Sequence, residues 1–186
     1  MRSRRSIVLA CVLLVAVPAL AFAAFTQVND AQGDGARFDI ASASVVKTPD
    51  GMLRHEIVTY GEYLPFDLLQ EKGPPPALCF LIWTVRVPGE GRPDYQLCAS
   101  ATSDGRKLRG TLARIPASGY PNKTKAVEVD RSDAKTVALE VTPKQLGNPR
   151  NYRFIAQSQD FGASCDRYIG CADFAPDRTN FKTFKP

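Results

Sequence analysis

The start of the chain differs from the rest in its pattern of apolar and polar positions. A short basic segment is followed by an apolar run over residues 7–25 and then by polar sequence. A basic start, an apolar stretch and a small-residue Ala-x-Ala site are typical of a secretory signal peptide. Ala21-Phe22-Ala23 fits that site, so we expect residues 1–23 to be removed. An uncleaved anchor is one alternative, because the run is near the lower length limit for a membrane-spanning helix. Lipidation at Cys11 and export by the twin-arginine route are the others.

Beyond this segment, apolar and polar residues recur with the two-residue period of β-strands. Within residues 52–60, for example, Leu53, His55 and Ile57 alternate with Arg54, Glu56 and Val58. Residues 77–87 are apolar on both faces, which is typical of a central strand that is buried on both sides. The predicted strands cover residues 38–46, 52–60, 77–87, 95–101, 107–115, 125–129, 136–141 and 152–157.

These strands, about eight in number and separated by turn residues, predict an all-β fold. The expected architecture is an antiparallel β-sandwich with jelly-roll connections, built as a single domain over residues 24–186. We expect a short helical turn at residues 64–70, which ends before a triple proline that no helix crosses. Residues 158–186 have a loop-like pattern.

The cysteines indicate a disulfide framework. Cys79, Cys98, Cys165 and Cys171 follow the signal peptide, and an even number in an exported chain favours disulfides over zinc ligation. Four cysteines allow three pairings, among which we favour 79 with 98 and 165 with 171. A hairpin centred on residues 88–94 would not place Cys79 directly opposite Cys98, so the first pair requires an offset or a different neighbouring strand.

Charge limits the class of partner. The formal net charge of the whole chain is +5, and removing Arg2, Arg4 and Arg5 with the signal peptide leaves +2. This small surplus gives no electrostatic case for nucleic acid, which requires many phosphate contacts. We expect a monomer that has no membrane contact after cleavage. A cationic strand region, which an acidic cell-wall polymer could use, consists of Arg106, Lys107, Arg109 and Arg114.

Three fragments resemble known sequences: residues 33–40, residues 53–60 and the segment from 151 to 177. Their order resembles a group of uncharacterised secreted bacterial β-sandwich domains. The opening fragment, residues 33–40, is also similar to the start of family 9 and DOMON-type carbohydrate-binding modules. The resemblance implies a jelly-roll fold and a carbohydrate ligand. Those modules use several aromatic platforms, however, and the one tryptophan here, Trp83, lies on the strand that we expect to be buried.

Two candidate sites follow from residue types. Asp30, Asp34 and Asp39 surround two glycines, and calcium binds carboxylate and loop carbonyl oxygens. We therefore consider a structural calcium ion there, against the alternative of a solvated loop; no cofactor is required. The ligand-binding candidates are aromatic side chains in or near loops, namely Tyr60, Tyr63 and Tyr120.

No catalytic motif accompanies these residues. His55 is the one histidine, and no nucleophile elbow is present, so we expect it to be a structural residue of the sheet. The leading interpretation is a non-enzymatic exported domain that binds carbohydrate or a cell-wall polymer. A secreted domain that binds or inhibits a cell-surface protein is the second hypothesis. A glycoside hydrolase with unidentified carboxylates is the third.

Overall fold

Strands make up most of the regular structure of the protein. The computed structural model describes residues 24–33, 37–69, 74–85, 92–119, 123–160, 171–176 and 180–186. The elements are β1 (Phe25–Asn29), β2 (Ile40–Lys47), β3 (Leu53–Thr59), η1 (Pro65–Leu68), β4 (Ala77–Trp83), β5 (Tyr95–Ala101), β6 (Leu108–Arg114), β7 (Thr124–Asp130), β8 (Thr136–Val141), η2 (Pro143–Leu146), β9 (Tyr152–Asp160), β10 (Cys171–Ala175) and β11 (Lys182–Phe184).

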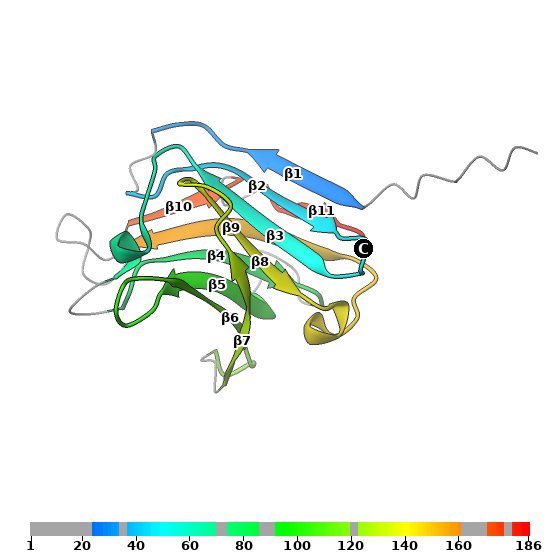
Figure 1. The fold of residues 1–186 in the computed structure, drawn as a ribbon. Coiled ribbons are helices and arrows are strands. Elements are labelled where there is room, and N and C mark those ends of the chain that lie inside the picture. Colours follow the sequence, from blue (N-terminus) through cyan, green and yellow to red (C-terminus); the bar gives the residue numbers. More distant parts are fainter. Residues whose placement is uncertain are drawn as a thin grey trace, which may run out of the picture.

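All the strands belong to one antiparallel sheet. The order is β1-β2-β3-β8-β7-β6-β5-β4-β9-β10, and β11 also pairs with β9. The sheet curls until its two ends meet, so that β1 lies against β11 and β2 against β10 (Figure 1). Two polar contacts join these ends: the Thr26 hydroxyl donates to the Thr183 carbonyl at 3.3 Å, and the Ile40 N–H donates to Asp173 Oδ2 at 2.6 Å. The result is a nearly closed barrel.

The expected all-β, antiparallel class is confirmed, and each of the eight predicted strands is present. The strand count was too low, because β1, β10 and β11 were not predicted. These strands have only three to five residues, so their alternation is too brief to recognise in the sequence. The short helical turn occurs as η1. The finer prediction, a sandwich with jelly-roll order, is not confirmed by this continuous sheet.

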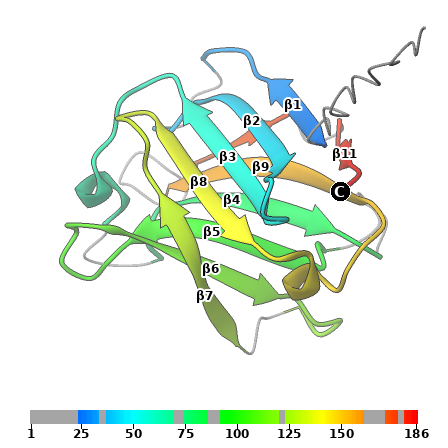
Figure 2. The same ribbon diagram turned by 45° about the vertical axis from the view of Figure 1, so that its right-hand side comes forward.

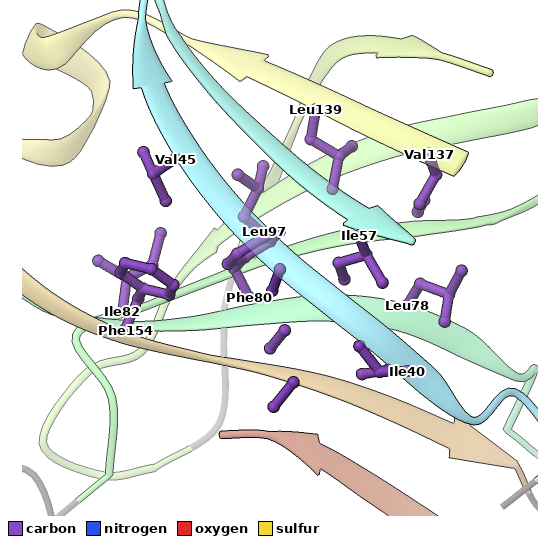
Figure 3. Close-up of a cluster of buried hydrophobic side chains, with 14 of the residues drawn as sticks. Ile40, Val45, Ile57, Leu78, Phe80, Ile82, Leu97, Val137, Leu139 and Phe154 are labelled. Atoms are coloured by element: carbon purple, nitrogen blue, oxygen red, sulfur yellow. The ribbon is translucent and has the colours of Figure 1, made fainter. Parts of the chain in front are cut away.

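The interior is filled by side chains from opposite walls of the barrel. Figure 2 shows the ribbon of the barrel from a second angle. In β3 the buried positions are Leu53, His55, Ile57 and Thr59, so the alternation expected from the sequence is confirmed. Apolar side chains from β2, β3 and β8 meet those from β4, β5 and β9 across the centre (Figure 3). Burial of this surface is the main stabilising contribution to such a fold.

Strand β4 is central, as its two apolar faces predicted, and lies between β5 and β9. Its outer face is also covered: Trp83 is buried and packs edge-on against Phe181, with ring centroids 5.0 Å apart. The register places Cys79 directly opposite Cys98, and the two form a disulfide with a Cα–Cα distance of 4.1 Å. The prediction that this pair requires an offset was wrong. Ile82 pairs with Tyr95, so the β4–β5 hairpin is centred earlier in the chain than residues 88–94 indicate. Cys171 is also disulfide-bonded, whereas Cys165 lies outside the described residues.

Candidate functional site

The predicted tyrosines do not form one exposed platform. Tyr60 is half-buried, and its hydroxyl donates to the carbonyl of Asp30 at 2.7 Å. Tyr63 is buried, and the Arg131 guanidinium lies 5.2 Å from the centre of its ring. Burial raises the pKa of Tyr63 to about 12, although Arg131 acts in the opposite direction. Tyr63 therefore offers no open ring to a ligand, and Tyr120 lies outside the described residues.

The aspartates of the predicted calcium site are used in local structure where they are described. Oδ2 of Asp39 accepts a hydrogen bond from the Gly33 N–H at 2.9 Å, which closes the loop between β1 and β2. The backbone of Asp30 bonds to Ala41 and receives the Tyr60 hydroxyl. Asp34 lies outside the described residues. Within the described ranges, no three His, Cys, Asp or Glu side chains form a group that could hold a metal ion, so calcium stays a prediction.

His55 lies inside the barrel, fully buried against the rings of Phe80 and Tyr152. Its Nδ1 lies 3.2 Å from the Leu53 carbonyl, and its Nε2 lies 2.8 Å from the Tyr152 hydroxyl. A carbonyl can only accept, so Nδ1 carries the proton and the Tyr152 O–H donates to Nε2. Burial lowers the pKa of His55 to about 4, so the ring is neutral at pH 7. This arrangement is that of a structural histidine.

A different region, at one end of the barrel, has the geometry of a binding site. There the sheet opens because β7 changes partner: its first half pairs with β6, while residues 128–130 pair with β8. Side chains on the inner face at this end are therefore not covered by a facing strand. The opening is a cavity of about 350 Å³. It is lined by Tyr95, Leu112, Arg114, Lys123, Lys125, Lys144, Gln145 and Gly147.

The sheet register explains why the cations of this cavity converge. Leu112 of β6 lies opposite Lys125 of β7, and Tyr95 of β5 lies opposite Arg114. Residues two positions apart on a strand share a face, so Lys123 points to the same side as Lys125. Leu112 is buried, which identifies this side as the inner face and places the exposed cations at its open end.

The turn η2 supplies the remaining wall and is held firmly. Thr142 and Gln145 form a reciprocal cap: the Thr142 N–H donates to Gln145 Oε1 at 2.7 Å, and the Gln145 N–H donates to Thr142 Oγ1 at 3.3 Å. Leu146 is buried in the core and anchors the turn. Gly147 follows with a φ of 82°, a left-handed conformation that favours glycine. These contacts place Lys144 at the opening on a fixed backbone.

A second cavity of about 270 Å³ continues from the first, and we call the pair the mouth groove. Tyr95, Arg114 and Gly147 line both cavities. The second is further lined by Asp94, whose Oδ2 accepts from the N–H groups of Thr84 and Val85 at 2.8 Å each. Asp94 is thus engaged with backbone donors at the far end of the groove. It is the one carboxylate among the described lining residues.

The four cations predicted as one region, Arg106, Lys107, Arg109 and Arg114, do not lie together. The structure places Arg106 and Lys107 in the turn between β5 and β6, at the end of the barrel opposite Arg114. Arg109 donates to the Ser100 hydroxyl at 3.1 Å on the outer surface. The missed signal was the alternation of Lys123 and Lys125 at the start of a strand. Only the register shows that these lysines lie beside Arg114.

Scans against family models, curated proteins and solved structures found no match for this chain. The resemblance to family 9 and DOMON-type modules therefore stays a prediction. Within the part of the chain that the structure describes, no helix has the length and apolarity needed to cross a bilayer.

Proposed function

We propose that this chain is an exported, non-enzymatic binding domain that holds a carbohydrate or cell-wall polymer in the mouth groove. The observation that carries the proposal is the groove itself. Its cavities of about 350 and 270 Å³ adjoin, and they combine an aromatic ring, Tyr95, with several hydrogen-bond donors. Small-ligand sites are usually clefts of roughly 300–1,000 Å³ in which a few placed polar groups orient the ligand.

Binding is favoured over catalysis by the placement of the titratable groups. The single histidine of the chain is committed to the core by its bonds to Leu53 and Tyr152. Glycoside hydrolysis uses two facing carboxylates, and Asp94 is one carboxylate already bonded to two backbone N–H groups. A hydrolase whose second carboxylate lies elsewhere is the alternative that the experiment below tests.

Export is supported by two features of the domain. Strand β1 begins at Phe25, just after the expected cleavage point at Ala23, so removal of residues 1–23 would leave the sheet complete. The Cys79–Cys98 disulfide agrees with folding in an oxidising compartment. We therefore infer a location in the medium or on the exterior of the cell envelope.

The test is co-sedimentation of disulfide-intact residues 24–186 with peptidoglycan, chitin and cellulose. We expect saturable binding to one polymer, no release of soluble fragments, and loss of binding in Tyr95→Ala. Phe25→Ala is the matched control, because Phe25 is 59 % exposed and lies on β1, away from the groove. Circular dichroism confirms that each variant is folded.

Three outcomes would overturn parts of this proposal. Release of soluble fragments would make the protein a hydrolase. Equal binding by folded Tyr95→Ala would move the site away from the groove. Failure to bind any insoluble or soluble polymer would favour a protein partner. Val85, which is 88 % exposed and lines the second cavity, is an apolar contact for such a partner.

A further inference from the structure

We propose that the mouth groove is selective for polyanionic chains, so that its ligand is an acidic rather than a neutral glycan. This inference rests on the proposed function and adds the charge of the ligand. It begins from the larger cavity, where Arg114, Lys123, Lys125 and Lys144 are the charged lining residues and no carboxylate is among them. These four cations come from β6, β7, η2 and the residue before β7, and they line one opening, although the net charge expected for the mature chain is only +2.

Two cations elsewhere on the protein, Arg37 and Arg54, are paired with carboxylates. Arg54 has salt bridges to Glu56, Asp130 and Glu140, and Arg37 has one to Asp67 at 2.8 Å. Within the described ranges, none of the four cations of the larger cavity has a salt bridge. Their charge is therefore not compensated by this part of the chain.

The spacing of the cations favours a ligand with several charges. Lys125 lies in β7 and Lys123 directly precedes that strand, a backbone separation of about 7 Å. Ala113 pairs with Thr124, so Arg114 follows next to Lys123, and all three cations line one cavity. Like charges this close repel one another, and an anion placed between them removes the repulsion. A chain that carries one anionic group per residue can meet several of these cations at once.

The walls favour a glycan as the carrier of that charge. Tyr95 is half-buried, its hydroxyl lies beside Gly147, and it lines both cavities. A polymer that passes from one cavity to the other therefore crosses this ring. Sugar rings present the flat apolar faces that pack on aromatic side chains. Lysine is a point charge that accepts carboxylate, phosphate or sulfate from many directions, so the selectivity is for charge rather than for one acid group.

The experiment compares two forms of one polymer. Isothermal titration of disulfide-intact residues 24–186 is carried out with polygalacturonate and with its methyl-esterified, uncharged form. We expect binding of the acidic form to be at least about tenfold tighter at low salt and to weaken as salt screens the charges. Two triple variants then locate the charge: a groove variant, Lys123→Gln, Lys125→Gln and Lys144→Gln, and a control, Arg106→Gln, Lys107→Gln and Lys135→Gln. Both lose the same charge, and the control positions lie in turns at the opposite end of the barrel.

The groove variant should bind the acidic form about tenfold more weakly, whereas the control should stay within about twofold of the parent. Equal affinity for the two polymer forms would overturn the inference and leave the proposed function standing. Equal losses in the two variants would also overturn it, since binding would then follow net charge. Binding of a single-stranded DNA of similar length as tightly as polygalacturonate would replace the glycan by nucleic acid. If neither form of polygalacturonate binds but an insoluble neutral polymer does, the inference of an acidic ligand is refuted. The proposed binding function would still stand in that case.

Discussion

The neutral histidine inside the barrel predicts that the protein loses stability in mild acid. Unfolding returns His55 to water, where its pKa is about 6.5, whereas burial holds it at about 4 in the folded protein. Between about pH 6.5 and pH 4 the unfolded chain therefore binds a proton that the folded chain does not. The free energy of unfolding falls as the pH falls through this window, and the loss is complete at about pH 4.

The size of the effect follows from the difference in pKa. One pKa unit corresponds to about 1.4 kcal/mol, so a fall from 6.5 to about 4 corresponds to roughly 3 kcal/mol. Small domains are stable by only about 5–15 kcal/mol, so this one group removes a substantial part of the total. Carboxylates titrate in the same range, and the histidine contribution must be separated from theirs.

A double variant makes that separation. His55→Leu combined with Tyr152→Phe removes the titrating ring and the hydroxyl that bonds to it, so no buried donor is left without a partner at this pair. Urea unfolding at intervals from about pH 7.5 to about pH 4 should show the parent losing roughly 3 kcal/mol more than the variant. The chain has one histidine, so proton NMR also follows a single imidazole signal, which should not titrate near pH 6.5. Parallel pH dependence in the two proteins, or a midpoint near pH 6.5, would refute the reasoning.

Three further predictions concern stability. Replacing Cys79 and Cys98 by alanine removes a disulfide between residues 19 positions apart and should lower the free energy of unfolding by about 3 kcal/mol. The measurement is the urea midpoint of unfolding, which should fall. Arg54→Gln leaves three carboxylates on the outer face without their shared cation and should cost about 1 kcal/mol, a loss that salt reduces; no salt dependence would contradict it. Gly110→Ala would place its Cβ 2.7 Å from a backbone oxygen of β7 and should cost about 1–3 kcal/mol, whereas Gly61→Ala meets nothing within 4 Å and should change the melting temperature little.

Local patterns in the sequence were sufficient for several parts of the fold. The alternation around His55 fixed which side chains of β3 face inward, and the apolar faces around Phe80 identified β4 as central. The capping pattern of Thr142, Gln145 and Gly147 was also present as a local signal for η2, although it was not recognised. In each case the information lies within a few residues.

The mouth groove could not be predicted in the same way. Lys144 belongs to a turn after β8, whereas Arg114 ends β6, and only the pairing of β7 with both neighbours brings them to one opening. Tyr63 illustrates the converse. Its loop position indicated exposure, but Arg131, 68 residues later, covers the ring. Register and long-range packing decided both outcomes.

The meeting of β1 with β11 has a consequence for the order in which the protein is made. Because synthesis proceeds from the N-terminus, β1 is made well before β11, the strand that it contacts. The contacts of Thr26 with Thr183 and of Ile40 with Asp173 form only after the C-terminal segment has been released. Until then the strand edges at both ends of the sheet stay exposed, and exposed strand edges favour edge-to-edge association. Even a short C-terminal truncation should therefore leave an open sheet that aggregates.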